Sequence, residues 1–226
     1  MRVLKFGGSS VGSAETIEKV IDIIRRSGEE DRCAIVLSAM QGTTDALINA
    51  ARTAESGDEV FGTMVRELES RHVSTARDLI GNGAADGLFD LIENQFNELR
   101  SICEGVYMLR ELTGKTLDRV VSFGEILSTR IVSAKLTADG VANSWLDSRK
   151  LIATDSNFTF AAVDFERTNR QIRAAFEDQD ATSIAIVPGF IASDADGRTT
   201  TLGRGGSDYT GAIFAAERPS FNPSQG

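Results

Sequence analysis

One stretch near the start of the chain limits the folds available to it. A short apolar run containing a lysine, residues 3–6, ends in the glycine-rich turn 7–12, and a helical pattern follows. Glycine allows backbone conformations that a Cβ forbids, so peptide N–H groups in such a turn can point towards an anion. The N-terminus of a following helix also favours negative charge. Because Lys5 adds a full positive charge, the stretch predicts a phosphate site whose backbone donors are Gly7, Gly8 and Ser9.

Other interpretations of this turn compete with phosphate binding. Taken alone, a glycine pair after an edge strand is about as often a simple tight turn. Neither the G-x-x-x-x-G-K-[ST] spacing of a P-loop nor the G-x-G-x-x-G spacing of dinucleotide-binding folds is present. Any phosphate chemistry at this turn must therefore use another fold.

The pattern up to Ser38 is strand, helix, strand. Ser13 can cap a helix that runs to about Arg26, with Gly28 as its expected stop. Residues 33–38 form a continuous apolar run, typical of a strand buried on both faces. Such a unit predicts an α/β protein with a mainly parallel sheet. Ser38 falls at the carboxyl end of the second strand, where ligands of such sheets bind.

A long helical block follows. From Thr43 to about Arg110 the apolar spacing is helical and predicts no strand. We expect this block, about residues 43–112, to lie beside the sheet as a lid or helical subdomain. Another long helix is predicted over residues 116–138, interrupted by Gly124. A glycine inside a helix costs about 1 kcal/mol relative to alanine, so either a close approach of another group explains Gly124 or the position is simply tolerated.

The last third of the chain returns to alternating elements. Its pattern predicts strands at 141–146, 151–154 and 183–187, a hairpin at 191–202, and helices at 165–177 and 209–216. A second glycine-rich turn, residues 203–208, lies between the hairpin and the last helix. Since the carboxyl ends of parallel strands share one edge, we expect the two glycine-rich turns to face a single cleft.

Composition narrows the class of protein. The chain has 226 residues and a net charge of −9, which suits one large domain or two small ones and argues against non-specific nucleic-acid binding. No stretch has the length of a membrane span, and the start lacks the apolar run of a signal peptide. Cys33 and Cys103 lie far apart, which predicts reduced thiols and a cytoplasmic location. With His72 as the single histidine, no protein-held metal site is expected.

The charged side chains near the two turns suit an anionic transfer reaction. Phosphoryl transfer needs positioning and positive charge more than covalent chemistry from the protein, and Lys5 can supply that charge. Arg204 matches a carboxylate bidentately, while Glu125 can receive an ammonium group. Asp208 can hold the same ammonium or orient Lys5. These groups predict an acidic amino acid held beside a nucleoside triphosphate, with hydroxyl contacts from Ser38 and Thr44.

A purely structural explanation competes with each assignment. A glutamate at the position of Glu125 is more often on a solvated helix face. Asp208, at a helix start, would ordinarily be a cap or a partner of the helix dipole. Arg204 would ordinarily be a surface charge and Phe190 a core residue. His72 lies within a helical pattern, and we assign it no catalytic role.

Four blocks that occur in order carry more specificity than any one of them. They are residues 5–11 (K-F-G-G-S-S-V), 36–39 with Thr44, 122–125 (S-F-G-E) and 199–209 (T-T-T-L-G-R-G-G-S-D-Y). Over residues 1 to about 216, their order and spacing resemble the aspartate kinases of the amino acid kinase superfamily. The family's usual threonine in the first block is Ser9 here, which keeps the hydroxyl.

The resemblance implies a fold and an activity. The fold would be a three-layer αβα sandwich with a mainly parallel sheet and a helical subdomain. The activity would be ATP-dependent phosphorylation of L-aspartate to 4-phospho-L-aspartate, the first step towards lysine, threonine and methionine. Mg²⁺ would arrive with the ATP phosphates. Neither nucleic acid nor a membrane would be a partner, and a homodimer stays open.

The resemblance also assigns roles to individual positions. Lys5 and Asp208 would be catalytic, with Lys5 neutralising charge on the moving phosphoryl group. Glu125 would bind the α-ammonium group of aspartate and Arg204 a carboxylate. The phosphate turn would comprise Lys5, Gly7, Gly8 and Ser9, and the aspartate site Ser38, Thr44, Glu125, Phe190, Arg204, Ser207 and Asp208.

The end of the chain departs from the family pattern. Residues 217–226 form a polar tail with two prolines, where the family continues into a nucleotide-holding segment and ACT domains. We therefore expect residues 1–216 to be the N-terminal portion of a kinase domain, with a disordered or altered tail. Some family members add homoserine dehydrogenase. The alternatives are another kinase of the superfamily, acting on acetylglutamate, glutamate or a nucleotide, and a non-catalytic fragment that binds aspartate.

Overall fold

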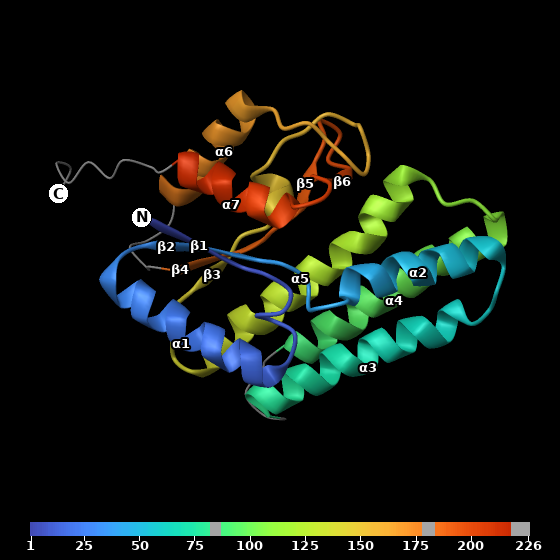
Figure 1. Ribbon diagram of the computed structural model, residues 1–226, viewed down its shortest axis with the longest axis horizontal. Coiled ribbons are helices and arrows are strands. Elements are labelled where there is room, and N and C mark those ends of the chain that lie inside the picture. The colour runs from blue at the N-terminus through green and yellow to red at the C-terminus, as the bar shows by residue number, and fades with distance from the viewer. Residues whose placement is uncertain (82–86, 178–183, 218–226) are drawn as a thin grey trace.

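The computed structural model describes residues 1–81, 87–177 and 184–217 of the chain. Figure 1 shows a small sheet between two layers of helices, with a bundle of long helices extending to one side. The strands are β1 (Arg2–Phe6), β2 (Cys33–Leu37), β3 (Ser144–Trp145), β4 (Ile184–Pro188), β5 (Ile191–Ser193) and β6 (Thr199–Thr201). The helices are α1 (Ala14–Glu30), α2 (Thr43–Ser56), α3 (Phe61–Ile80), α4 (Leu88–Leu109), α5 (Gly114–Ala138), the 3₁₀ turn η1 (Ser148–Lys150), α6 (Phe165–Glu177) and α7 (Gly206–Ala216).

The main sheet has the strand order β1-β2-β4-β3, and every neighbouring pair is parallel. Its register pairs Lys5 with Val36 and Val36 with Val187, so the carboxyl ends of three strands lie at one edge. β5 and β6 form a separate antiparallel hairpin that turns at Gly197. The predicted parallel sheet and hairpin are both confirmed.

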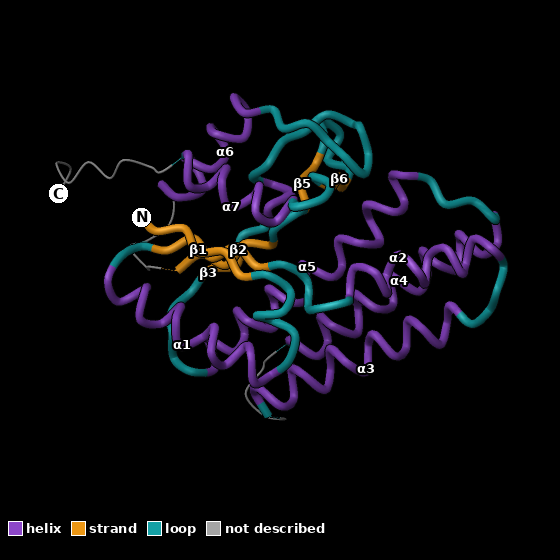
Figure 2. Tube along the Cα trace, viewed as in Figure 1, coloured by secondary structure: helices purple, strands orange, loops and turns teal. Residues whose placement is uncertain are grey.

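The two faces of the sheet carry different cores because successive side chains of a strand point to opposite faces. On β2, Ile35 and Leu37 belong to the larger core cluster with residues of α1 and α5. Ala34 and Val36 belong to the second cluster with residues of α6 and α7. Figure 2 shows the strands between these two helical layers. The three-layer αβα arrangement implied by the resemblance is therefore present.

The block predicted to be helical forms a subdomain of α2, α3 and α4, which pack on one another and on α5 (Figure 1). Its described residues contain no strand. His72 of α3 is fully buried against Phe96, and its Nδ1 lies 2.7 Å from the carbonyl oxygen of Leu68. Burial lowers the pKa of His72 to about 4, so this imidazole is a neutral core residue.

Helix α1 is longer than predicted. It continues past Gly28 to Glu30, and the Asp31 N–H caps it by donating to the carbonyl oxygen of Ser27 at 3.1 Å. A glycine costs a helix only about 1 kcal/mol. A glycine is an effective stop when it adopts the left-handed backbone, as Gly57 does after α2 with a φ of +80°.

The strand predicted at 151–154 is wrong. Residues 151–154 make only isolated bridges, from Ala153 to Ser193 and from Thr154 to Val163. The Ser193 N–H donates to the carbonyl oxygen of Ile152 at 3.1 Å and the Thr154 N–H donates to that of Ser193 at 2.9 Å, so a few backbone bonds hold this segment in place of a continuous ladder. β3 is also shorter than the predicted 141–146. Apolar periodicity detects buried extended chain but not whether a neighbouring strand is there to pair with it.

Parts of two predictions lie outside the described residues. Ser183, the predicted start of the strand that becomes β4, is one of them, and residues 218–226 of the predicted tail are the others. Glu217 closes α7 by donating its N–H to the carbonyl oxygen of Ile213. Among the described residues, no helix combines the length and the apolar character that a membrane span requires.

Gly124 in α5 lies against the chain that follows β2. A Cβ at this position would be 2.8 Å from the Cβ of Ala39 and 3.3 Å from Cγ2 of Thr43. The close approach of another segment therefore explains the glycine, and α5 packs directly beneath the carboxyl end of β2.

We expect Gly124→Ala to lower the free energy of unfolding by about 1–3 kcal/mol, because the added methyl group separates α5 from Ala39. The matched control is Gly105→Ala in α4, where no atom of the described residues lies within 4 Å of the new Cβ. There the better helix propensity should stabilise the protein by up to about 1 kcal/mol. Urea unfolding measures both changes, and equal effects at the two positions would contradict this explanation of Gly124.

Candidate functional site

A cavity of about 680 Å³ opens at the carboxyl edge of the sheet. The ends of β1 and β2, the N-termini of α2 and α7 and one face of α5 contribute to its wall. The predicted site residues that line this cleft are Lys5, Gly8, Ser38, Thr44, Glu125, Phe190, Arg204, Ser207 and Asp208. The two glycine-rich turns therefore do face one cleft, as their positions after strands predicted.

Lys5 and Asp208 form an ion pair across the cleft wall, with Nζ 2.8 Å from Oδ1. A Cβ on Gly7 would lie 3.5 Å from this Nζ, and a Cβ on Gly211 would lie 3.5 Å from the Cβ of Lys5. Glycines thus leave room on both sides of the lysine. This ion pair fits the role in which Asp208 orients Lys5, and contact of Asp208 with a substrate ammonium group stays a prediction.

Gly7 and Ser9 are not among the described residues that line the cleft. Gly7 lies beside Lys5, whereas Ser9 is exposed. The N–H groups of Ser10 and Val11 donate to the carbonyl oxygens of Gly7 and Gly8, which closes the turn on itself. Phosphate contact by Gly7 and Ser9 stays a prediction, and Gly8 is the residue of this turn that reaches the cleft.

Helices α2 and α7 both present N-termini without a side-chain cap to the cleft. Each begins after a left-handed glycine, Gly42 or Gly205, and neither glycine offers a side-chain cap. Unpaired N–H groups and the helix dipole favour an anion at such ends. The start of α1, which we expected to serve this purpose, is closed instead by a capping box in which the Ser13 hydroxyl accepts from the Thr16 N–H.

Glu125 is buried in the wall of the cleft, with only 3% of its surface exposed. One carboxylate oxygen, Oε1, accepts from the Ala39 N–H at 3.2 Å, and the other, Oε2, has no partner among the described residues. Burial raises the pKa of Glu125 to about 8, while the N–H of Ala39 opposes that rise. The solvated-face interpretation is thus wrong. A buried carboxylate with a free oxygen suits a cationic ligand group, which would supply the missing partner.

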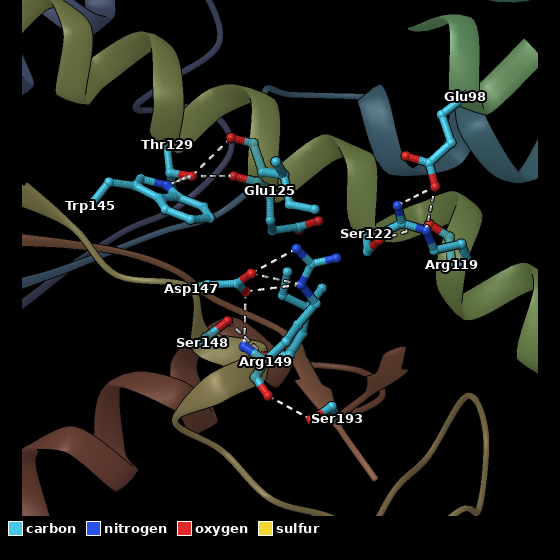
Figure 3. A network of polar contacts seen from close by, with 12 residues as sticks. Glu98, Arg119, Ser122, Glu125, Thr129, Trp145, Asp147, Ser148, Arg149 and Ser193 are labelled. Carbon is cyan, nitrogen blue, oxygen red and sulfur yellow. Dashed lines mark hydrogen bonds and ion pairs between the residues drawn. The ribbon is translucent and has the colours of Figure 1, made fainter. Parts of the chain in front are cut away.

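The helix around Glu125 is fixed to its neighbours by hydroxyl groups. The Ser128 hydroxyl donates to the carbonyl oxygen of Ser38 at 2.7 Å, which ties α5 to the end of β2. Figure 3 shows the next turn of α5, where Thr129 donates to the Glu125 carbonyl oxygen and accepts from the indole N–H of Trp145. The position of Glu125 is therefore set by bonds to β3 and to the residue that follows β2.

Arg204 is exposed, and among the described residues it has no ion-pair partner. Phe190 is half-buried and lines the cleft with a positive φ of +69°, so the simple core interpretation is wrong. A Cβ on Gly206 would lie 2.7 Å from the Phe190 ring. Ser207 packs equally closely against Gly189, where an added Cβ would lie 2.8 Å from the Ser207 Oγ.

Several residues of the cleft were missed in the sequence. The most informative is Asp118, which is 1% exposed on α5 and precedes Glu125 by two helical turns. The sequence pattern that could have identified Asp118 is a carboxylate next to Leu117, at a position that helical spacing places on the inward face. Other described residues that line the cleft without having been predicted include Gln41, Asp45, Val121, Thr159 and Thr201.

The described residues contain no group of three or more His, Cys, Asp and Glu side chains that could hold a metal ion. What they do contain is an anion-favouring cleft at the carboxyl edge of a parallel α/β sheet, with a lysine, a free arginine and a buried carboxylate. Fold and cleft together define an α/β protein of the class that binds small charged ligands at this edge.

Comparisons with known proteins specify the family. The model of the amino acid kinase family matches residues 1–218, and the chain belongs to that family. It is 37% identical to aspartokinase 1 of Arabidopsis thaliana over 92% of the chain and 36% of the relative. It is 31% identical to bifunctional aspartokinase/homoserine dehydrogenase 1 of Zea mays over 95% of the chain and 23% of the relative.

A solved structure agrees with these relatives. E. coli aspartokinase III in complex with aspartate and ADP superposes with a TM-score of 0.86 and 27% identity, covering 96% of this chain and 46% of that one. The chain spans less than half the length of each of these proteins.

We expect Glu125→Gln to change how stability depends on pH. Because the folded pKa is raised to about 8 from 4.5, the stabilising effect of protonated Glu125 is fully present at low pH and is lost as the pH rises through 8. Between about pH 5 and 8 the wild-type free energy of unfolding should fall by about 3–4 kcal/mol more than that of the variant. Urea unfolding at several pH values measures this.

The control for this experiment is Glu104→Gln, which removes an exposed carboxylate on α4. Its pH profile should follow that of the wild type. If Glu125→Gln also followed the wild type, Glu125 would be ionised in the folded protein throughout this pH range.

Proposed function

We propose that this chain carries the aspartate-binding part of an aspartokinase, which transfers the γ-phosphoryl group of ATP to the side-chain carboxylate of L-aspartate. The observation that carries the proposal is that one cleft holds both Glu125 and Arg204. Glu125 is a buried carboxylate with one oxygen that has no partner among the described residues, and Arg204 has no ion-pair partner among them. An amino acid with a second carboxylate supplies a counter-charge to each.

The roles in substrate binding follow from charge. The α-ammonium group of aspartate would pair with Glu125, and Arg204 would bind a carboxylate through two parallel N–H bonds. Ser38 and Thr44 offer hydroxyl groups beside the uncapped start of α2. Phe190 and Ser207 shape the wall between Arg204 and the end of β4.

The transfer step needs little covalent chemistry from the chain. A carboxylate oxygen of aspartate attacks the γ-phosphorus as the bond to the ADP oxygen breaks, and the products are 4-phospho-L-aspartate and ADP. Lys5, held by Asp208, would neutralise the charge on the moving group. The N–H groups at the start of α7 would donate to phosphate oxygens.

ATP and Mg²⁺ are the proposed cosubstrate and cofactor. ADP in the related E. coli structure supports the nucleotide. Mg²⁺ typically takes one or two protein carboxylates and the oxygens of substrate phosphates. The exposed carboxylates of Asp45 and Asp208 line the cleft and fit that requirement. The bound ion would neutralise phosphate charge, and most of its ligands would come from the nucleotide and water.

The alternatives predict different ligands. A kinase for acetylglutamate or glutamate is not favoured, because the relatives are aspartokinases. Acetylglutamate also lacks a free amine, so it offers no cation to Glu125. A binding-only fragment would take aspartate but not nucleotide. Synthesis of lysine, threonine and methionine is the metabolic role we propose, with a cytoplasmic location that the buried free thiols of Cys33 and Cys103 support.

Calorimetry of this chain with L-aspartate and with N-acetylglutamate tests the proposal. We expect aspartate to bind and acetylglutamate not to bind. Arg204→Ala should weaken aspartate binding about 10- to 100-fold, because a charged hydrogen bond contributes about 1.5–3 kcal/mol. The control Arg52→Ala removes an exposed arginine of α2 outside the cleft and should leave the affinity unchanged. Binding of acetylglutamate alone would overturn the choice of substrate.

Lys5→Ala should lower kcat for aspartyl phosphate formation about 10²–10³-fold, because a positive charge at the transition state is lost. Trapping the acyl phosphate with hydroxylamine measures the product. Lys19→Ala is the matched control, since Lys19 pairs with Glu15 on the surface of α1, away from the cleft. A Lys5→Ala enzyme with nearly full turnover would show that Lys5 has another role.

A further inference from the structure

Asp118 is a buried carboxylate that lies in the wall of the cleft and joins three parts of the chain. It belongs to α5, and its Oδ2 accepts from the N–H groups of Thr159 at 2.8 Å and Thr201 at 3.0 Å. Its Oδ1 accepts from the Thr201 hydroxyl at 2.7 Å. Burial raises the pKa of Asp118, and these three bonds oppose the rise. Unlike Glu125, it has partners for both oxygens.

The two segments that Asp118 holds also hold each other. The Ala161 N–H donates to the carbonyl oxygen of Thr201 at 2.9 Å. The Phe160 ring covers Gly203 so closely that a Cβ there would lie 2.3 Å from Cδ2. Gly203 has a φ of +74°, and it directly precedes Arg204. Residues 201–203, which lead to the exposed Arg204, are thus buried.

Thr159 has a strained backbone, which points to a constraint in this segment. Its φ is +71°, in the left-handed region that a β-branched residue rarely adopts. Such a conformation persists where the surroundings determine it, and it occurs often at ligand sites. The bond from the Thr159 N–H to Asp118 is one such determinant, and Thr159 lines the cleft.

We propose that Asp118 is a positioning residue of the substrate site: by fixing Thr201 and Thr159 it sets the place of the Arg204 guanidinium. This inference rests on the proposed function, since it assigns Arg204 to a substrate carboxylate. Both carboxylate oxygens of Asp118 already accept hydrogen bonds from the protein, so we assign it no contact with the substrate. It acts through hydrogen-bond geometry and not through its charge.

The matched pair of variants is Asp118→Asn and Asp118→Ala. Asparagine keeps every contact, because its oxygen can accept from both N–H groups while its amide donates to the Thr201 hydroxyl oxygen. Alanine removes all three. In calorimetry with L-aspartate, we expect Asp118→Ala to weaken binding about 10- to 100-fold and Asp118→Asn to stay close to the wild type. If both variants lost affinity equally, the negative charge would be what matters and the proposal would be wrong.

A double-mutant cycle separates positioning from a general loss of structure. In an Arg204→Ala background, Asp118→Ala should cost little further affinity, because the group it positions is gone. Fully additive losses would show that Asp118 does not act through Arg204. Should Asp118→Ala fail to fold, Thr201→Val removes the hydroxyl contact alone and Thr201→Ser restores it, so affinity should fall with the first and return with the second.

Amide hydrogen exchange tests the same proposal without a ligand. The N–H groups of Thr159 and Thr201 should exchange faster in Asp118→Ala and at the wild-type rate in Asp118→Asn. Unchanged exchange in Asp118→Ala would overturn the positioning role. A wild-type chain that binds no aspartate would refute the proposed function instead, and the exchange rates would still decide whether Asp118 holds this loop.

Discussion

The parallel register of β1, β2 and β4 is the constraint on which the cleft depends. Hydrogen bonds between these strands place Lys5 level with Val36 and Val187, so the segments that leave the three strands emerge together. Each then supplies a different element to the cleft: the glycine-rich turn, the start of α2, and the Phe190 segment that leads to the hairpin. A shift of one residue in any pair would send a strand's core side chains to the opposite face of the sheet.

Helix α5 gives the cleft its two buried carboxyl groups. Asp118 and Glu125 lie two turns apart on its inward face, and both carboxyl pKa values are raised by burial. The difference between them is in their partners. Asp118 accepts three hydrogen bonds and stabilises loops, whereas Glu125 keeps one oxygen without a partner among the described residues. A structure with an unpaired buried carboxylate is less stable than it could be, and binding of a cation would remove that cost.

The helical subdomain stabilises the loops of the cleft from behind. Arg71 of α3 donates to the carbonyl oxygens of Gln41 and Gly12, at 2.8 Å and 3.1 Å. The Gln41 N–H in turn donates to the carbonyl oxygen of Gly8. The glycine-rich turn and the segment after β2 are therefore joined to each other and to α3. Loops that carry binding residues are placed accurately when rigid elements hold both their ends.

The sequence by itself determined the α/β class, the helical block and the residues that gather at the cleft, because periodicity, glycine turns and the carboxyl ends of parallel strands follow from local chemistry. It did not identify Asp118 or Thr159, the absence of a strand at 151–154, or which helix starts stay uncapped. Those features depend on which segments meet. Only the tertiary structure decided them, since burial, strain and a missing hydrogen-bond partner are properties of a packed neighbourhood and not of a residue.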